Sequence, residues 1–495
     1  MSAPEPSTGP SEHLDVVIVG AGLSGIGAAC QLREHHPRRR VAVLESREVS
    51  GGTWDLFRYP GVRSDSDMFT LGYPFRPWKS SRMIVDGESI RHYIEDTAAE
   101  EGIDAHIRFQ HRIVRAEWST DDARWHVTAE RTGTGETVEV TCGFLFSCSG
   151  YYRYDHGYQP DFPGLDRFGG TFVHPQHWPE DLELDGRRVV VIGSGATAVT
   201  LVPSLAERGA EVTMLQRSPT YIASVPGENP VVAAVQRLLP DKLAGAAVRW
   251  AHALGTQAFY QVSQRYPAPV RRLLRFGVRR QLPRGYDIDT HFSPHYDPWD
   301  ERMCAVPGGD LFKAIRSGRA TVVTDHIDTF TDRGIRLQSG TELEADVVVS
   351  ATGLELLFLG GIELVVDGEP VELRERLTYK GMMLEGIPNL AIAIGYTNAS
   401  WTLKCDLTCR YVMRLLNHLR ETGLRQCTPV NRDPDVTSAP LLDLRSGYVQ
   451  RALEHMPQQG SKFPWRVDRG LHPRPPGTRR AANIEGGLGV AHPAA

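Results

Sequence analysis

Two glycine-rich strings, 173 positions apart, carry the clearest chemistry in this sequence. Each follows an apolar run and precedes a helical pattern, which predicts a tight turn between a strand and a helix. In such a turn the missing side chains let a pyrophosphate approach the N–H groups at the start of the helix. The positions expected to bind dinucleotides there are Gly20, Gly22, Gly25, Gly193, Gly195, Ala196 and Thr197. Two such turns indicate two bound dinucleotides and electron transfer between them.

The end of the second strand in each unit indicates which dinucleotide is bound. Glu45 stands 25 positions after Gly20, where a carboxylate accepts hydrogen bonds from an adenosine ribose, and this suits FAD. At the equivalent point of the second unit stand Arg217 and Ser218, a cation and a hydroxyl that suit a 2′-phosphate. This pair favours NADPH over NADH. The alternative is that Arg217 is a solvated residue at the end of a strand.

The string Gly51-Gly52-Thr53-Trp54 bears on the class of flavin chemistry. Two-dinucleotide enzymes that reduce disulfides carry a cysteine pair just after a similar glycine pair. Here Trp54 stands at the place of the first cysteine, and the next cysteine along the chain is Cys142. Flavin-to-disulfide chemistry is therefore disfavoured. Reaction of a flavin with oxygen remains, in which the cofactor performs the chemistry and the protein binds and orients it.

The linking segment 168–179 fits FxGxxxHxxxWP, the signature of flavin-dependent Baeyer–Villiger monooxygenases. Segments 51–67, 193–198 and 351–353 add to the likeness. From about residue 14 to about residue 465 the chain resembles the class B flavoprotein monooxygenases of the Baeyer–Villiger type, in particular their mycobacterial ethionamide-activating branch. The related flavin-containing monooxygenases carry a similar string that lacks the Trp-Pro ending.

This resemblance implies FAD and NADPH as cofactors and insertion of one oxygen atom from O₂ beside a ketone carbonyl, through a C4a-peroxyflavin, to give an ester or lactone. Sulfides or thioamides are implied as further substrates. Arg302 would stabilise the negative charge that develops, and Asp65 would hold and tune Arg302. The alternatives are a surface salt bridge for Arg302 and a helix or turn cap for Asp65. Further expected cofactor contacts are Thr53, Trp54, Tyr59, Asp65, Arg302 and Thr352.

One position departs from the pattern of the family. Many members have lysine immediately before the active-site arginine, where it assists with the 2′-phosphate, and here the residue is Glu301. The expected preference for NADPH then depends more heavily on Arg217 and Ser218, and is expected to be weaker than usual.

Two rival functions fit the same residues. One is a heteroatom monooxygenase that oxidises sulfur or nitrogen and has little ketone activity. The other is a redox sensor that binds FAD and NADP⁺ without turnover. His174 and His177 also form an HxxH pair, but no carboxylate or cysteine completes a zinc pattern around them, so no metal is expected. By resemblance, His174 lies in the linker between domains and couples their movement.

The elements that must position these residues alternate between strand and helix. We expect an α/β fold with two Rossmann-like dinucleotide-binding domains, for FAD and NADPH, and a helical insertion in the second. The expected FAD-binding domain covers 13–150 and 351–470, and the NADP-binding domain covers 151–225 and 299–350. Between them we expect the helical insertion at 226–298, and at the end a C-terminal tail at 471–495.

Composition and charge limit the remaining possibilities. With 41% hydrophobic and 23% charged residues the chain is typical of soluble globular proteins, and a net charge of −5 gives no reason to expect nucleic acid as a partner. Seven cysteines without a CxxC pair favour reduced thiols and a cytoplasmic location. Segment 270–280 is basic and amphipathic; a solvated helix face and weak contact with a membrane surface are the alternatives. The oligomeric state stays open.

Overall fold

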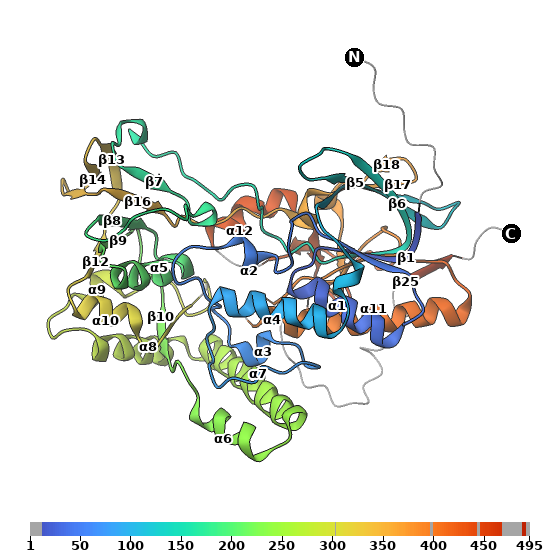
Figure 1. The fold of residues 1–495 in the computed structure, drawn as a ribbon, viewed down its shortest axis with the longest axis horizontal. Helices are drawn as coiled ribbons and strands as arrows, with labels where there is room; N and C mark the ends of the chain where they lie inside the picture. Colours follow the sequence, from blue (N-terminus) through green and yellow to red (C-terminus); the bar gives the residue numbers. More distant parts are fainter. Residues whose placement is uncertain (1–11, 302, 397–398, 443–445, 468–487, 492–495) are drawn as a thin grey trace.

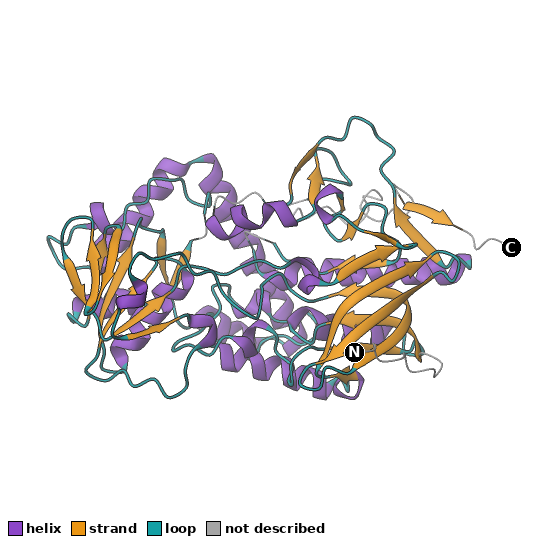
Figure 2. Cartoon of the chain, turned by 90° about the horizontal axis from the view of Figure 1, so that it is seen from above, coloured by secondary structure: helices purple, strands orange, loops and turns teal. Residues whose placement is uncertain are grey.

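The computed structural model describes residues 12–301, 303–396, 399–442, 446–467 and 488–491. Its strands gather in two groups at opposite ends of the molecule, with most helices between and below them (Figures 1 and 2). The larger sheet lies at the right of Figure 1 and the smaller parallel sheet at the left. Each group contains one of the two glycine-rich turns.

The larger sheet has nine strands in the order β18-β17-β4-β5-β6-β1-β2-β3, with β21 also paired to β6. Strands β1, β2, β6 and β21 run parallel, and β4, β5 and β6 form an antiparallel meander. Their bounds are β1 Glu12–Val19, β2 Val41–Leu44, β3 Ile107–Arg108, β4 His111–Ser119, β5 Arg124–Arg131, β6 Thr137–Ser147, β17 Glu363–Val366, β18 Glu369–Pro370 and β21 Leu390–Ile392.

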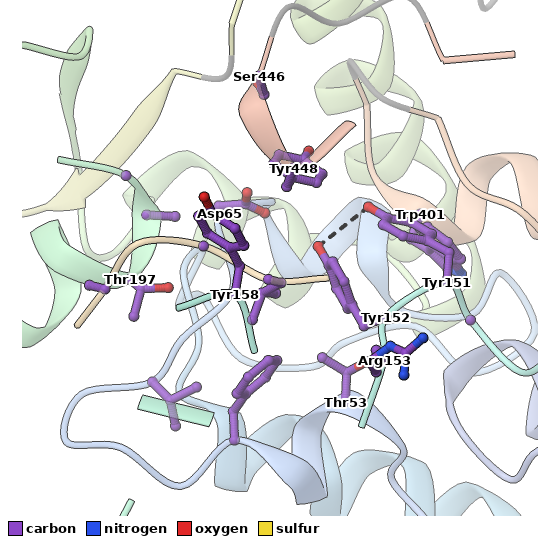
Figure 3. Close-up of a pocket in the computed structure, with 18 of the residues that line it drawn as sticks. Thr53, Asp65, Tyr151, Tyr152, Arg153, Tyr158, Thr197, Trp401, Ser446 and Tyr448 are labelled. Carbon is purple, nitrogen blue, oxygen red and sulfur yellow. Dashed lines mark hydrogen bonds between the residues drawn. The ribbon is translucent and has the colours of Figure 1, made fainter. Parts of the chain in front are cut away.

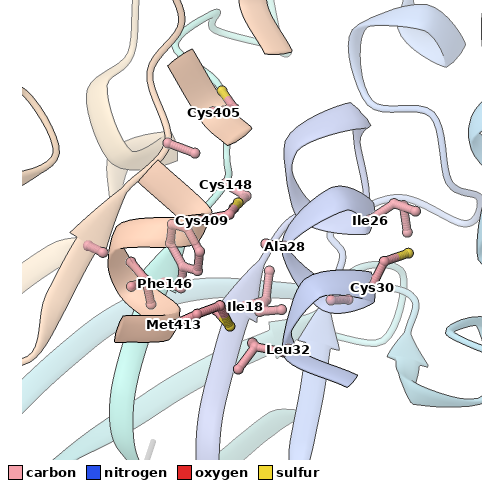
Figure 4. Packing of buried hydrophobic residues seen from close by; sticks show 14 of the residues in the cluster. Ile18, Ile26, Ala28, Cys30, Leu32, Phe146, Cys148, Cys405, Cys409 and Met413 are labelled. Carbon is pink, nitrogen blue, oxygen red and sulfur yellow. The ribbon is translucent and has the colours of Figure 1, made fainter. Parts of the chain in front are cut away.

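Helix α1 (Leu23–His35) packs between this sheet and helix α11 (Trp401–Thr422). Figure 4 shows this core, in which apolar side chains of β1, α1 and β6 meet those of α11. The second half of strand β1, from Val16 to Val19, is a continuous apolar run because both faces of this part of the sheet are covered. The packing therefore fixes the start of α1, where the first glycine turn lies.

The smaller sheet has five parallel strands in the order β12-β9-β8-β16-β7. Taken in chain order from β8, the first four of these follow the 3-2-1-4 order of a Rossmann unit. The bounds are β7 Thr171–Val173, β8 Arg188–Ile192, β9 Glu211–Gln216, β12 Ala320–Thr324 and β16 Val347–Ser350, with α5 Ala196–Glu207 and α10 Asp310–Arg316 beside them. A three-stranded sheet adjoins it: β13 Ile327–Thr331, β14 Gly334–Leu337 and β15 Glu342–Glu344.

Four helices interrupt the second unit between strands β10 (Ile222–Val225) and β11 (Cys304–Pro307), which pair in parallel. They are α6 Pro230–Leu238, α7 Asp241–Arg265, α8 Pro267–Gln281 and α9 Ile288–His291. Helices α6 and α7 lie along the lower edge of Figure 1. The inner face of this helix pair packs through Val232 and Val248 against Phe69 of α3 (Met68–Leu71).

The remaining elements connect or cover these units. They are α2 Thr53–Leu56, α3 Met68–Leu71, α4 Gly87–Glu100, α12 Gly447–Ala452, β19 Thr378–Tyr379, β20 Met383–Leu384, β22 Gln426–Pro429, β23 Ser438–Pro440, β24 Gln458–Gly460 and β25 Leu488–Ala491, with short 3₁₀ turns between them. Within the described ranges, no helix combines the length and apolar character needed to cross a bilayer. The expected α/β fold with Rossmann-like units is confirmed; the exact domain limits stay predictions, and the expected tail at 471–495 lies mostly outside the described residues.

Candidate active site

Both glycine-rich turns line one cavity of about 1430 Å³. It lies between the two Rossmann-like units, and residues from both line it. The expected site residues that line it are Gly20, Gly22, Glu45, Thr53, Trp54, Tyr59, Asp65, Gly193, Gly195, Ala196, Thr197, Arg217, Ser218 and Thr352. Gly25 does not line it, because it packs inside the turn: a Cβ there would come 1.8 Å from the Gly20 carbonyl oxygen. Arg302 lies outside the described residues.

The first turn is shaped for close approach of a ligand. Gly20 has φ +92°, and a Cβ on it would lie 3.0 Å from the carbonyl oxygen of Cys148. Gly22 precedes α1 and faces Gly52, whose Cα would be 3.5 Å from an added Cβ. No side chain caps the N-terminus of α1, and its first turn carries no acidic residue. Its N–H groups can therefore bind an anion.

The two glycines of the second turn, Gly193 and Gly195, are required for different reasons. Gly193 has φ +133°, and a Cβ on it would lie 2.4 Å from the carbonyl oxygen of Ala351, so the fold itself requires glycine. Gly195 has φ −78° and an added Cβ would meet no atom within 4 Å. The fold does not require glycine at 195, but the open space in front of α5 fits a pyrophosphate. The residues present therefore fit a second dinucleotide.

Glu45 is buried at the end of β2 and supports the first turn. Its Oε2 accepts a hydrogen bond from the Ala21 N–H at 2.6 Å, and its Oε1 accepts one from the Arg47 N–H at 2.8 Å. A carboxylate has about four lone-pair sites, so acceptor capacity is left for a ribose hydroxyl. The residue expected to bind a ribose thus also fixes the backbone of the glycine-rich turn.

The segment 51–67 connects the two units. Burial raises the pKa of Tyr59 to about 12, and its hydroxyl hydrogen-bonds Thr197 at the start of α5. Thr53 Oγ1 lies 3.3 Å from the hydroxyl of Tyr154. Both tyrosines are neutral at physiological pH because burial disfavours the phenolate. They position the segment through hydrogen bonds rather than through charge.

Asp65 extends from the same segment toward the cavity (Figure 3). Its Oδ1 accepts a hydrogen bond from Ser66 Oγ at 3.4 Å. The helix cap in this Ser/Asp run is a different residue: Asp67 accepts from the Thr70 N–H at 2.9 Å and caps α3. The cap interpretation therefore applies to Asp67, and Asp65 lines the cavity.

Arg217 and Ser218 are exposed at the end of β9 on the cavity wall. The carbonyl oxygen of Ser218 accepts a hydrogen bond from Ser194 Oγ at 2.9 Å, which ties this corner to the second glycine turn. Glu301 also lines the cavity; burial raises its pKa, and the positive charge of Arg217 opposes that rise. Glu301, which stands where the family pattern has lysine, therefore interacts electrostatically with Arg217.

The signature residues of the linker lie behind the cavity wall. His174 Nε2 lies 3.3 Å from the carbonyl oxygen of Gly353, and burial lowers the pKa of its ring. Gln176 Nε2 donates to the carbonyl oxygens of Arg153 and Tyr154 at 2.9 and 3.0 Å. These contacts hold the linker segment 168–179 to the loop that follows β16 and to the loop that follows β6. Among the described residues no group of three His, Cys, Asp or Glu side chains is arranged to bind a metal.

Aromatic residues that sequence reasoning missed form much of the cavity wall (Figure 3). The rings of Tyr151 and Trp401 lie 5.0 Å apart, and Trp401 Nε1 donates to Ser24 Oγ at 2.7 Å. The Arg451 guanidinium lies 3.3 Å from the centre of the Tyr158 ring. Four tyrosines between 151 and 158 were the available signal. Apolar, aromatic walls of this kind exclude water from a site.

Two family models match the chain. The model described as "Flavin-binding monooxygenase-like" matches residues 69–244, and the one described as "NAD(P)-binding Rossmann-like domain" matches residues 18–82. The fold is similar to that of an oxidized steroid monooxygenase bound to NADP, at a TM-score of 0.71 and 24% identity over 84% of this chain and 88% of the other. An open cyclohexanone monooxygenase matches at a TM-score of 0.72 and 21% identity, over 85% and 90%.

Fold and cavity thus define an α/β protein with two dinucleotide-binding units. The FAD-containing monooxygenase EthA of Mycobacterium tuberculosis is 53% identical over 459 residues, 92% of this chain and 94% of the relative. The putative FAD-containing monooxygenase MymA of the same organism is 53% identical over 469 residues, 92% and 93% of the two chains. The chain belongs to the family of FAD-containing flavoprotein monooxygenases, and the class expected from the sequence is confirmed.

Proposed function

We propose that this protein is an FAD- and NADPH-dependent Baeyer–Villiger monooxygenase that inserts one oxygen atom from O₂ beside a ketone carbonyl. The product is an ester or a lactone. The observation that carries this proposal is the single cavity of about 1430 Å³ that both glycine-rich turns line. Two dinucleotides bound at these turns would meet in one space, as hydride transfer between them requires.

In this proposal FAD is held by the first turn, with its ribose at Glu45 and its pyrophosphate at the N-terminus of α1. Thr53, Trp54 and Tyr59 lie against it from the segment 51–67, and Thr352 lies on the opposite loop. When bound and reduced, FAD supplies the activated form of O₂ that the reaction needs. The aromatic wall around Tyr151 and Trp401 excludes water from this part of the cavity.

NADPH is held by the second turn, at the N-terminus of α5, in front of the open space at Gly195. Arg217 and Ser218 bind the 2′-phosphate through a charge-assisted hydrogen bond and a hydroxyl contact. Glu301 weakens this preference, because it places a carboxylate near Arg217. We therefore expect a preference for NADPH that is real but modest.

Arg302 is proposed to stabilise the negative charge that develops on the substrate oxygen, with Asp65 orienting it. Support comes from its two neighbours along the chain, Glu301 and Met303, which both line the cavity, as does Asp65. Arg302 is the catalytic residue of this proposal and Asp65 its positioning residue.

We further propose oxidation of sulfides or thioamides as a second activity. All seven cysteines are free, which favours action in the reducing cytoplasm.

The test is product analysis by mass spectrometry with labelled O₂ on a panel of ketones and sulfides, at several pH values. We expect labelled ester, and ketone turnover that rises with pH relative to sulfide oxidation, because a ketone needs a deprotonated, nucleophilic oxidant and a sulfide a protonated one. Arg302→Ala should lose ester formation on the order of 10²–10³-fold and retain FAD. Asp65→Ala should depress ketone oxidation more than sulfide oxidation.

Sulfoxide without ester across the whole panel would move the assignment to a heteroatom monooxygenase. NADPH oxidation that no substrate accelerates would contradict both oxygenase assignments and favour a redox sensor. Undiminished ester formation by Arg302→Ala would mean that another cation of the cavity wall, such as Arg451, stabilises the charge.

A further inference from the structure

Exposed apolar side chains concentrate in the helical insertion. Of the fourteen large hydrophobic residues that are exposed in the described chain, ten lie between 231 and 276, so they form a patch rather than a scatter. The ten are Val231, Leu238, Leu239, Leu243, Trp250, Leu254, Val262, Tyr266, Leu273 and Phe276. Soluble proteins rarely leave so many large apolar groups together in water without a partner for them.

Helical spacing places these side chains on the outer faces of their helices. On α7, Leu243, Trp250 and Leu254 are seven and eleven positions apart and share one face, with Trp250 57% exposed. On α8, Leu273 and Phe276 are 61% and 56% exposed and three positions apart. On α7 and on α8 the exposed residues therefore lie along one outer face of the helix.

The opposite faces of the same helices are already in use. Val232 of α6 and Val248 of α7 pack in a cluster with Phe69. Val278 of α8 packs in the core of the smaller sheet. The Arg249 guanidinium of α7 donates to the carbonyl oxygens of Thr70 and Gly72 at 2.9 and 2.6 Å. The insertion is thus anchored from inside, and its outward faces stay directed at solvent.

The helices that carry the patch are strongly basic in sequence, although Arg249 is turned inward and Arg271 and Arg275 form ion pairs with Asp297 and Asp289. Between 230 and 281 the chain has nine Arg and Lys residues and a single acidic residue, Asp241, although the whole chain has a net charge of −5. Helix α8 alone carries five arginines and no acid. Among the described residues, neither Arg272 nor Arg279 forms an ion pair within the chain. The Arg280 guanidinium lies 5.7 Å from the Phe276 ring, so charge and apolar surface alternate closely.

We infer that the outer faces of α6, α7 and α8 dock on an anionic lipid membrane surface. Large apolar side chains with interspersed arginines are the pattern of helices that lie in the interface plane of a bilayer. The arginines meet lipid phosphates, and Trp250, Leu273 and Phe276 enter the boundary of the acyl chains. A second copy of this chain is disfavoured as the occupant, because two strongly basic faces repel each other.

Docking would also bring the substrate cavity to the membrane. Helix α7 carries the exposed Trp250 and Leu254 on its outer face, while its Ala253 and Thr256 line the cavity. One helix is therefore shared by the cavity wall and the docking surface. The inference concerns binding to a surface and does not depend on the proposed reaction.

The test is flotation of the full chain with vesicles of phosphatidylcholine alone and of phosphatidylcholine and phosphatidylglycerol in about equal parts. We expect binding to the anionic vesicles, little to the neutral ones, and weaker binding as salt is raised. The double variant Arg272→Gln/Arg279→Gln should lower the partition coefficient roughly twenty-five-fold, at about fivefold for each charge removed. Leu273→Ser should lower it severalfold through loss of apolar contact.

Matched controls separate this surface from general charge and hydrophobicity. Arg187→Gln/Arg208→Gln makes the same charge change at exposed positions on the second Rossmann-like unit. Leu407→Ser makes the same apolar change at an exposed position of α11. Both controls should bind anionic vesicles like the unchanged chain.

Three results would overturn the inference. One is absence of flotation with anionic vesicles at low salt. Another is equal loss in the control variants, which would show that no particular surface is involved. A third is an oligomer in light scattering that Leu273→Ser dissociates while vesicle binding is unaffected, which would assign the patch to a second copy of the chain.

Discussion

Arg63 forms an ion pair with Asp310, and this pair joins the segment 51–67 to the second Rossmann-like unit. Arg63 belongs to the segment 51–67 of the first unit, and Asp310 is the first residue of α10 in the second. The side chains are only 12% and 21% exposed. Asp65 follows Arg63 by two positions, so the pair helps to hold the segment that presents Asp65 to the cavity.

Breaking this pair should destabilise the protein. Arg63→Gln or Asp310→Asn leaves one largely buried charge without its partner, so we expect each to lower the free energy of unfolding by about 2 kcal/mol. The double variant should cost less than the sum of the two. Urea unfolding measures all three. The control is Arg115→Gln, in the more exposed pair of Arg115 with Glu363, which should cost less than about 1 kcal/mol. A cost for Arg63→Gln no greater than for this control would contradict the prediction.

Gly195→Ala should damage cofactor binding without damaging the fold. The added Cβ meets no protein atom within 4 Å, so the free energy of unfolding should fall by less than about 1 kcal/mol. It takes up the space of the pyrophosphate, and binding of NADP⁺ should weaken by more than roughly tenfold. Titration calorimetry and urea unfolding give the two quantities.

Gly193→Ala is the matched comparison, since its Cβ would lie 2.4 Å from a carbonyl oxygen and its φ is +133°. It should lose several kcal/mol of stability, on the order of 3 kcal/mol. If Gly195→Ala bound NADP⁺ as well as the unchanged protein, the second turn would not be the pyrophosphate site.

Arg217→Ala should raise the KM for NADPH and leave the KM for NADH nearly unchanged. Loss of a charge-assisted contact costs about 1–3 kcal/mol, or roughly 5- to 150-fold in kcat/KM. Steady-state NADPH and NADH oxidation provide the comparison. Arg208→Ala, at an exposed arginine just after α5, is the control and should change neither value. Equal KM values for the two nicotinamides in the unchanged enzyme would exclude a role for Arg217 in discrimination.

The KM for NADPH should respond to the charge of Glu301. Burial raises the pKa of this carboxyl, so acidification neutralises it at a higher pH than an exposed glutamate. At neutral pH the charged carboxylate of Glu301 partly neutralises the positive charge of Arg217. At lower pH the carboxyl is protonated, this neutralisation is lost, and the protein should bind NADPH more tightly. Glu301→Gln should therefore have the lower KM for NADPH at neutral and higher pH, and its advantage over the unchanged enzyme should shrink as the pH is lowered.

The quantity to compare is the KM for NADPH of Glu301→Gln divided by that of the unchanged enzyme at each pH. Titration of the 2′-phosphate itself affects both enzymes alike and therefore cancels in this ratio. NADH, which lacks this phosphate, is the control and should show a ratio near one throughout. A ratio for NADPH that stays constant across the pH range would contradict a titrating Glu301.

Much of the site was predictable because its glycines and Glu45 directly follow strands that neighbouring residues specify. Gly20 and Gly193 follow apolar strands directly, and strand, turn and helix are specified by neighbouring residues. Glu45 likewise follows β2, and the structure puts it beside the first turn. Local spacing did not predict that Asp67, rather than Asp65, caps α3 in the Ser/Asp run. Two acids two positions apart differ only in the contacts that the folded chain offers them.

The sequence by itself determined the class of this protein: two dinucleotide turns, the α/β fold and the flavin monooxygenase family. Only the tertiary structure decided which distant residues lie close together and which helix faces stay exposed. Trp401 meets Ser24 across 377 positions, and Glu301 meets Arg217 across the second unit. An apolar stripe on a helix ordinarily predicts burial, yet Leu273 and Phe276 of α8 stay exposed because α8 uses its opposite face to pack. Local pattern specifies an element, but burial and charge environment arise only when distant elements pack together.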